Sequence, residues 1–306
     1  IDEALKCGVS AVKFQTKDIE TAFPQNLLNK NYEGPNSFGK TYREHKQVLE
    51  LSIPQLKELK EYSEKKDLIF FSTPFDIKSL NDLISLDLEI FKISSFHVTD
   101  LELVDAVSKI NKPVIISTGM STIEEIDNAV NILEKNRCKY LIMHCVSSYP
   151  AKPEDLNLKA ITTLREKYGC LVGYSGHESS ANIAPSVILY DACAIERHFT
   201  LDRGMEGPDH AASLEPSEFK ALVSGIRELE EALGDGRKRS VSQGEMINRE
   251  NLAKSLVAAS DLKKGIVLES RHLKSRSPGL GLSAQFYQQI LGRKLQRSMQ
   301  EEDYFY

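Results

Sequence analysis

A short β-strand is predicted by the alternation of side chains in Ile195-Glu196-Arg197-His198-Phe199-Thr200-Leu201-Asp202. Successive strand residues point to opposite faces, so Glu196 and His198 share one face. Residues 171–177 (LVGYSGH) have the same design and end in His177. Consecutive parallel strands of an α/β protein present their ends at one edge of the sheet. The pattern therefore predicts that His177 and His198 lie together, as the ligands of a metal site would.

Strand-like and helix-like patterns alternate from residue 10 to residue 233. The predicted strands lie at 10–16, 68–75, 89–95, 113–119, 140–147, 171–177 and 192–200. The predicted helices lie at 52–66, 77–86, 100–110, 121–136, 158–168, 180–190 and 216–233. For the helix at 121–136 we expect a capping box of Ser121 and Glu124. Near-continuous apolar strands are typical of a parallel sheet covered on both faces.

This alternation leaves two fold classes, a doubly wound sheet and a (β/α)8 TIM barrel. The glycine pattern of a dinucleotide-binding turn follows none of the strands, whereas nearly every strand ends in polar residues. A barrel gathers all of those ends at one mouth, so we favour the TIM barrel. The chain opens on the end of a helix that has no start signal, which predicts that the first barrel strand lies upstream of residue 1.

The composition changes after Leu233, which indicates a second unit. We assign residues 1–235 to the barrel, 236–250 to a polar linker and 251–306 to a small, mainly β domain. A domain of that size is near the lower limit for independent folding, so we expect it to lean on another surface. Within the barrel, the long segment at 17–46 is expected to be functional or partly helical.

Composition and charge exclude several classes of function. The 306 residues include 27% charged residues with a net charge of −5, which gives no electrostatic footprint for nucleic acid. No apolar run reaches the ~18 residues of a membrane-spanning helix, and no signal peptide is visible. The five cysteines are scattered without a CxxC pair, which favours free thiols in the cytoplasm. Cys145, beside His144 at a strand end, is an alternative candidate as a nucleophile.

Two constellations at the strand ends could hold ligands. His177 and His198 are either two ligands of an open metal site or hydrogen-bonded residues of the barrel mouth. Lys13 and Lys92 lie inside strands, where a buried ammonium needs an anion. Together with the hydroxyl residues around them they would form a cradle for a phosphate or carboxylate. Alternatively, the lysines reach solvent or pair with Glu196.

The ordered set of motifs resembles the sialic acid synthase family, the phosphoenolpyruvate-dependent nonulosonate synthases. The matching motifs are VKFQ (12–15), STPF (72–75), FKISS (91–95), STGM (117–120), HCVSSYP (144–150), GYSGH (173–177), IERHFT (195–200) and GPD (207–209). Residues 252–293 resemble the C-terminal antifreeze-like (SAF) domain of that family. The resemblance covers essentially the whole chain.

The resemblance implies a transferase that condenses phosphoenolpyruvate with an N-acyl hexosamine of the N-acetylmannosamine type, giving a nine-carbon 2-keto acid and phosphate. It implies a divalent metal at His177 and His198, with Mn²⁺ expected and Mg²⁺ or Co²⁺ as alternatives. Catalytic roles fall on His177, His198, Lys92 and His97. The implied contacts to phosphoenolpyruvate are Lys13, Thr73, Lys92, Ser95, Thr118, Ser147 and Ser175. The implied sugar contacts are Tyr149, Asp209 and Arg276, and Arg276 would reach across a domain-swapped homodimer.

The sequence departs from the family pattern at three places. The first strand of the family, with its catalytic Glu, is absent before Ile1; His97 stands where an acid is usual, and Ser147 replaces a more usual Asn. The stretch 94–96 is closer to the pseudaminic and legionaminic acid synthases, which are the alternative to an N-acetylneuraminate synthase. More distant alternatives are another metal-dependent barrel aldolase or lyase and a non-catalytic sugar-binding protein.

Overall fold

The computed structural model of the protein describes residues 1–34, 36–207, 209–238 and 240–306. The chain divides into two compact units, Ile1–Leu233 and Gly234–Tyr306. Each unit has its own apolar cluster of buried side chains. None of the helices among the described residues is both long and apolar enough to cross a membrane.

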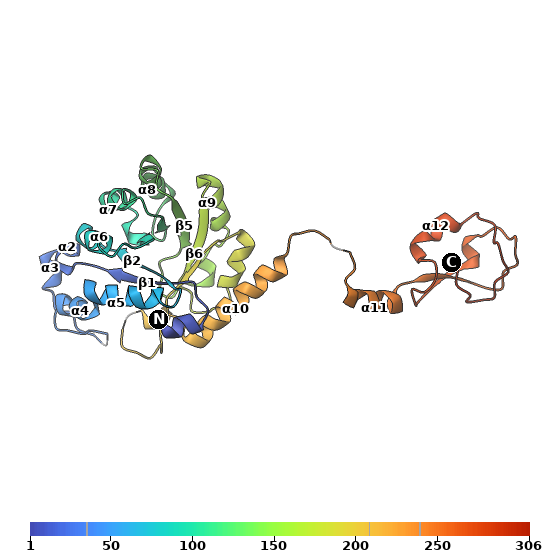
Figure 1. Cartoon of the computed structure of the whole chain (residues 1–306), viewed down its shortest axis with the longest axis horizontal. Helices are drawn as coiled ribbons and strands as arrows, with labels where there is room; N and C mark the ends of the chain where they lie inside the picture. The colour runs from blue at the N-terminus through green and yellow to red at the C-terminus, as the bar shows by residue number, and fades with distance from the viewer. Residues whose placement is uncertain (35, 208, 239) are drawn as a thin grey trace. The chain divides into compact units, whose positions relative to one another are not determined.

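The first unit is built on a seven-stranded parallel sheet whose strands pair in sequence order, from β1 to β7. The strands are β1 (Ala11–Thr16), β2 (Ile69–Pro74), β3 (Phe91–Ile93), β4 (Val114–Ser117), β5 (Tyr140–Cys145), β6 (Leu171–Gly176) and β7 (Ile195–Arg197). The sheet is curved, and helices surround its outer face (Figure 1). Strictly consecutive pairing rules out a doubly wound sheet, in which the strand order reverses at a switch point. The unit is therefore an α/β fold of the partial-barrel type.

Helices follow the strands along the chain and cover the sheet. They are α1 (Asp2–Lys6), α2 (Ile19–Ala22), α3 (Gln25–Leu28), α4 (Tyr42–Leu49), α5 (Ile53–Glu64), α6 (Ile77–Ile84), α7 (Leu101–Ser108), α8 (Ile123–Lys135), α9 (Ala160–Tyr168) and α10 (Pro216–Leu233), with the 3-10 turns η1 (Ser95–His97), η2 (Pro153–Asp155), η3 (Ala184–Tyr190) and η4 (His210–Ala212). Alternate strand residues such as Ile93, Ile116 and Ile142 are buried against this helical layer. The opposite face carries the site residues, together with apolar residues such as Ile115 and Leu141, which lie in register with Lys92.

Three local predictions were wrong. Residues 180–190 were expected to form an α-helix but contain the 3-10 turn η3, which has a proline near its start and ends at Asp191 in the left-handed conformation. The strand expected at 192–200 forms its ladder with β6 only over Ile195–Arg197, and Phe199 instead makes an isolated bridge to Leu214. The capping box of α8 consists of Thr122 and Glu125, one residue later than expected, because Ser121 bonds instead to the carbonyl of Gly119.

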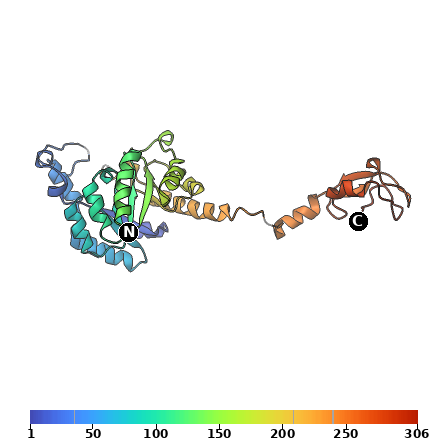
Figure 2. The same ribbon diagram turned by 90° about the horizontal axis from the view of Figure 1, so that it is seen from above.

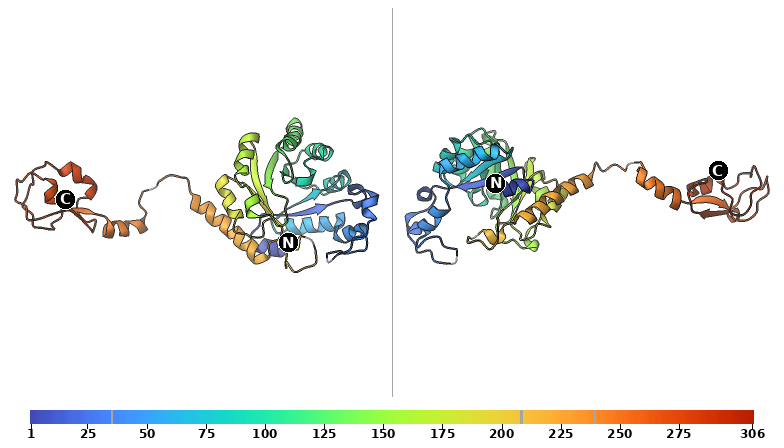
Figure 3. Two further views of the ribbon diagram at one scale, coloured as in Figure 1. Left: turned by 180° about the vertical axis from the view of Figure 1, so that it is seen from behind. Right: turned by 60° about the horizontal axis from the view of Figure 1, so that its bottom comes forward.

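The long segment between β1 and α5 is partly helical, as expected, and contains α2, α3 and α4. Figure 2 shows these short helices, in blue, at the rim of the first unit. An ion pair joins the start of the segment to its end, with the Nζ of Lys17 2.9 Å from a carboxylate oxygen of Glu50. At the base of the unit, α1 lies against α10 (Figure 3), and the thiol of Cys7 donates to the carbonyl of Pro216 over 3.2 Å.

The second unit contains the helix α11 (Gln243–Leu252), which the sequence analysis assigned to the linker. An antiparallel pair follows, β8 (Ser255–Ala258) with β9 (Leu273–Arg276). Isolated bridges connect this pair to other residues of the unit, as between Val257 and Tyr304. The 3-10 turns η5 (Ser270–His272) and η6 (Ala284–Phe286) and the short helix α12 (Tyr287–Ile290) complete the unit. Its apolar cluster is small, in keeping with its length.

The revised cap of α8 gives a direct test of the local structure. Thr122→Ala should lower the free energy of unfolding by about 1 kcal/mol, because it removes the acceptor for the Glu125 amide. The matched change Ser121→Ala should cost less than about 0.5 kcal/mol. Urea denaturation of the full chain measures both, and equal losses would contradict the assignment.

Candidate active site

Strand register places the predicted site residues on the inner face of the sheet. Cys145 of β5 pairs with Ser175 of β6, and Ser175 pairs with Glu196 of β7. Parallel partners in register point to the same side, so these three side chains form one row. His177 and His198 follow β6 and β7, and their ring centroids lie 5.4 Å apart. The structure thus brings together the two histidines on which the metal prediction rests.

His177 is oriented as a metal ligand would be. Its Nδ1 lies 2.8 Å from the carbonyl oxygen of Val146, which can only accept a hydrogen bond. The proton of a neutral ring is therefore on Nδ1, which leaves the lone pair of Nε2 available. Burial opposes a charge on the ring, but the thiol of Cys145, 3.7 Å from Nδ1, raises the pKa of His177 above its ordinary value.

His198 is a neutral imidazole at the same place. Burial lowers the pKa of His198 below its usual range, and the nearby His177 and Lys13 act in the same direction against the opposing charge of Asp209. The ring of Tyr149 lies 4.3 Å from that of His177 and 5.9 Å from that of His198. Tyr149 thus lies against the histidine pair, where a sugar contact was predicted.

The donor set fits an open divalent site with two protein ligands. Among the described residues, no group of three or more His, Cys, Asp or Glu side chains has metal-binding geometry. Two neutral imidazoles would leave the remaining coordination positions to water and substrate oxygens, as catalytic sites require. Mn²⁺ and Mg²⁺ accept such mixed sets of nitrogen and oxygen ligands.

A pair of lysines lies on the same inner face, bridged by Glu196. Lys92 is only 2% exposed, and its Nζ lies 3.0 Å from one carboxylate oxygen of Glu196. Lys13 lies 3.6 Å from the other oxygen. Burial raises the pKa of Glu196, but the two ammonium groups outweigh it and lower that pKa to about 2. Burial also lowers the pKa of Lys92, which Glu196 counteracts.

The charge balance of this network leaves room for an anion. Two ammonium groups and one carboxylate sum to a net charge of +1, in a site largely shielded from water. In the protein without a ligand, Lys13 and Lys92 therefore pair with Glu196, which is the alternative considered in the sequence analysis. One positive charge is left over, and a phosphate or carboxylate ligand would neutralise it.

Two buried hydroxyl groups lack partners on this face. Among the described residues, Thr73 and Ser117 have buried hydroxyl oxygens without a hydrogen bond. Buried polar atoms are rarely left unpaired, so a ligand or water is expected to bond to them. By contrast, the hydroxyl of Thr118, the predicted contact next to Ser117, already donates to the carbonyl of Met143 over 3.1 Å.

Gly119 keeps the neighbouring hydroxyl cluster open. A Cβ at Gly119 would lie 2.2 Å from the oxygen of Ser147, 2.9 Å from that of Ser95 and 3.1 Å from the sulfur of Cys145. The structure therefore brings Ser95 and Ser147, both predicted ligand contacts, to within reach of one point. A cavity of about 720 Å³ lies beside them, between the starts of α8 and α9.

His97 occupies an aromatic environment. Its Nδ1 lies 2.8 Å from the hydroxyl of Ser94, and its ring centroid lies 5.1 Å from Phe75 and 4.3 Å from Phe96. Burial lowers its pKa, so the ring is neutral near pH 7. Within the described part of the chain, these contacts do not include the histidine pair or the lysines. A catalytic role for His97 remains a prediction.

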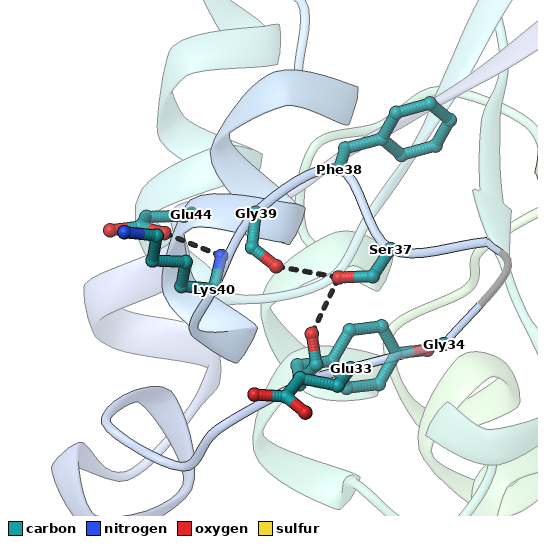
Figure 4. Close-up of a pocket in the computed structure, with 8 residues that line it drawn as sticks. Glu33, Gly34, Ser37, Phe38, Gly39, Lys40 and Glu44 are labelled. Atoms are coloured by element: carbon teal, nitrogen blue, oxygen red, sulfur yellow. Dashed lines mark hydrogen bonds between the residues drawn. The ribbon is translucent and has the colours of Figure 1, made fainter.

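The remaining predicted contacts lie in loops. Asp209 follows Pro208, which lies outside the described residues, and its charge acts on His198. The amide of Gly207 donates to Asn36 over 3.3 Å, so the segment between β1 and α5 reaches the loop after β7. An open hollow of about 570 Å³ lies in that segment, where the hydroxyl of Ser37 donates to the carbonyl of Gly39 over 2.6 Å (Figure 4). In the second unit, Arg276 is 52% exposed and pairs with Glu302 at 3.6 Å.

Fold and site together define an α/β partial barrel with a cationic, hydroxyl-lined site and a histidine pair at the carboxyl ends of its strands. Comparison with known proteins identifies its family: the NeuB family profile matches residues 1–238, and the chain belongs to this family.

Several named relatives are similar over nearly the whole chain. The chain is 38% identical to an N,N'-diacetyllegionaminic acid synthase of Campylobacter jejuni, covering 99% of this chain and 92% of the relative. It is 34% identical to a pseudaminic acid synthase of the same species, covering 99% and 88%. The crystal structure of an N-acetylneuraminic acid synthetase from Leptospira borgpetersenii superposes with a TM-score of 0.68 at 34% identity, covering 82% of this chain and 84% of that one.

The sequence analysis did not include three participants among the predicted contacts of this site. Glu196 was weighed there as an alternative partner of the two lysines, and the structure has that pairing. Ser117 was set aside in favour of Thr118, and only the hydrogen bonds separate the two. Gly119 carries no side chain, so its role became visible only from the distances around it.

The Glu196 network predicts a pH-dependent stability. Because the folded pKa of Glu196 is about 2, well below that of an unfolded glutamate, the ionised carboxylate stabilises the protein fully above about pH 5. That stabilisation, on the order of 3 kcal/mol, is lost as the pH falls towards 2. Glu196→Gln should therefore be destabilising at pH 7 and nearly neutral at low pH. Urea denaturation across this range checks it, and a pH-independent loss would contradict the ion network.

Proposed function

We propose that the protein is a nonulosonic acid synthase that condenses phosphoenolpyruvate with an N-acyl hexosamine to a nine-carbon 2-keto acid and phosphate. The observation that supports this most strongly is the buried Lys92, with Lys13 and Glu196, beside the paired imidazoles of His177 and His198. An anion cradle next to a pair of histidines suits a phosphorylated enol and an aldehyde. Relatives named as synthases of three such acids support the same activity.

The chain's own residues would hold phosphoenolpyruvate by charge and by hydroxyl donors. Lys13 and Lys92 would neutralise its phosphate and carboxylate, while Glu196, 3.0 Å from the Nζ of Lys92, opposes the effect of burial, which lowers the pKa of Lys92. Thr73 and Ser117 would donate their unpaired hydroxyls. The remaining predicted contacts line the same face or its edge; they are Ser95, Thr118, Ser147 and Ser175. Fixing the anion in this way orients carbon 3 of the enol towards the acceptor.

The sugar would bind on the side of the histidine pair. A divalent ion held by His177 and His198, for which Mn²⁺ is our proposal, would polarise the aldehyde as a Lewis acid. Tyr149 would contact the sugar across the rings of His177 and His198, and Asp209 would accept from its hydroxyls. Carbon 3 of phosphoenolpyruvate then attacks the aldehyde, water adds at carbon 2, and the bond from that carbon to the phosphate oxygen breaks.

The acceptor distinguishes the members of this family, and two choices are open. The relative named as a legionaminic acid synthase is 38% identical, whereas the human N-acetylneuraminate-9-phosphate synthase is 32% identical. The stretch Ser94-Ser95-Phe96 agrees with the first comparison. A legionaminic or pseudaminic acid precursor is therefore the second candidate for the acceptor, beside N-acetylmannosamine.

We also infer the larger architecture. An eighth strand between β1 and β7 would close the sheet into a TIM barrel, and residues 251–306 would be a SAF domain, joined by residues 236–250. We propose a homodimer in which Arg276 serves the partner's site. A cytoplasmic location agrees with free thiols at Cys7, Cys138, Cys145, Cys170 and Cys193.

Phosphate release tests the activity. The full chain should release inorganic phosphate from phosphoenolpyruvate only when Mn²⁺ and an N-acyl hexosamine are both present. N-acetylmannosamine and 2,4-diacetamido-hexoses serve as parallel acceptors. If no acceptor gives release, the synthase proposal is wrong, and a non-catalytic sugar-binding protein becomes the better explanation.

The metal assignment predicts that His177→Ala and His198→Ala each abolish stoichiometric Mn²⁺ binding, because two imidazoles are the minimum set here. Binding is measured from the loss of the free Mn²⁺ electron paramagnetic resonance signal. His144→Gln is the control, since the Nε2 of His144 is engaged with the carbonyl of Leu156 at 2.7 Å. Stoichiometric binding in both alanine variants would remove the assignment.

The role of Arg276 predicts a selective kinetic effect. Arg276→Ala should raise the KM for the sugar about tenfold or more, with a change in the KM for phosphoenolpyruvate below about twofold. Lys274→Ala, two residues away on β9 and paired with Glu301, is the matched control. Equal effects on both substrates would argue against a sugar contact.

A further inference from the structure

The two histidines are tied together behind the site by a buried ion pair. Glu178 follows His177 in the chain, and Arg197 precedes His198. An Nη atom of Arg197 lies 2.9 Å from Oε1 of Glu178, and the two side chains are 0% and 2% exposed. The hydroxyl of Tyr174 donates to the other carboxylate oxygen over 2.9 Å, so both oxygens of Glu178 are engaged.

Two arginines also donate hydrogen bonds to the backbone of residues 178–180, which follow His177. Arg197 donates to the carbonyls of Glu178 and Ser180, the latter over 3.3 Å. Arg203 donates to the carbonyl between them, Ser179, over 3.1 Å. Three consecutive carbonyls after β6 are thus bound by side chains from β7 and the loop that follows it. Arg203 is itself fixed by Glu218 of α10 at 2.9 Å.

The side chains of this network pack closely against the backbone of β6 at Gly176. Gly176 pairs in register with Arg197, and a Cβ on Gly176 would lie 2.6 Å from Oε2 of Glu178 and 2.6 Å from the ring of Tyr174. The network therefore presses directly on the strand backbone. Any shift of Arg197 would move the end of β7, and with it His198, relative to His177.

We propose that Arg197, Glu178 and Arg203 form a positioning clamp that sets the separation of the His177 and His198 rings and thereby the affinity of the pair for a divalent cation. The inference rests on the proposed metal role of the two histidines. With only two protein ligands, affinity depends on both lone pairs meeting at one point. Residues that orient metal ligands typically change affinity by about tenfold to hundredfold when they are replaced.

Lysine at the arginine positions tests the clamp while keeping the charge. A lysine carries its three N–H donors on one nitrogen and has no planar fork, so it cannot span the acceptors that the separate Nη atoms of Arg197 reach. Arg197→Lys and Arg203→Lys in the full chain should weaken Mn²⁺ binding by about tenfold to hundredfold, measured by electron paramagnetic resonance. Calorimetric binding of phosphoenolpyruvate without metal should change by less than about twofold, because Lys13 and Lys92 are untouched.

Arg165 supplies a matched control in the same unit. It bonds a carbonyl, that of Tyr190 at 3.0 Å, and the carboxylate of Asp191 at 2.6 Å, away from the histidines. Arg165→Lys should leave Mn²⁺ affinity unchanged while causing a comparable loss of hydrogen bonds. If it weakens Mn²⁺ binding equally, the clamp is a general stability effect and the proposal fails.

The outcomes separate the clamp from the activity it serves. If Arg197→Lys does not fold, Arg203→Lys, whose side chain is 32% exposed, and Tyr174→Phe carry the test. A folded Arg203→Lys with wild-type Mn²⁺ affinity, in a protein that binds Mn²⁺ and releases phosphate, overturns the clamp alone. A wild-type protein that binds no Mn²⁺ overturns both the clamp and the metal part of the proposed function.

Discussion

The site depends first on the burial of Lys92 inside the sheet. An ammonium group that is 2% exposed must have a counter-charge, and Glu196 supplies it at 3.0 Å while also reaching Lys13. Since Glu196 lies two residues before His198, the same short strand joins the anion cradle to the histidine pair. β7 is thus the element at which the buried charges, the histidine pair and the sheet register meet.

At β6 and β7, the two faces of the sheet carry different sets of polar residues. On the inner face, Ser175 and Glu196 lie beside the histidines and the lysines. On the outer face, Tyr174 and Arg197 lie in the buried network with Glu178. A buried ion pair of this kind contributes little net stability compared with apolar packing. The ion pair of Arg197 and Glu178 is better explained by our proposal that it positions His177 and His198 on the inner face.

The sequence predicted the consecutive βα units because apolar strands and capped helices have local signatures, and it predicted that His177 and His198 would meet. It did not predict the 3-10 turn at Ala184–Tyr190, because the expected helix ran through Pro185, a local signal against a helix interior, and because the left-handed conformation of Asp191 is visible only in the structure. It placed the α8 cap one residue early, since Ser121 and Thr122 are equally good caps. Neither the unpaired hydroxyl of Ser117 nor the space that Gly119 leaves could be predicted, because unpaired hydroxyls and missing Cβ atoms are visible only in three dimensions.

We propose that one site holds both an anion and a divalent ion, at the lysine pair and the histidine pair. A crystal structure of the full chain with Mn²⁺ and phosphoenolpyruvate, using anomalous scattering to locate the metal, tests this. We expect an anomalous peak shared by Nε2 of His177 and His198, with the phosphate or carboxylate in contact with Lys92. A metal peak elsewhere, or an anion that does not touch Lys13 or Lys92, would contradict it.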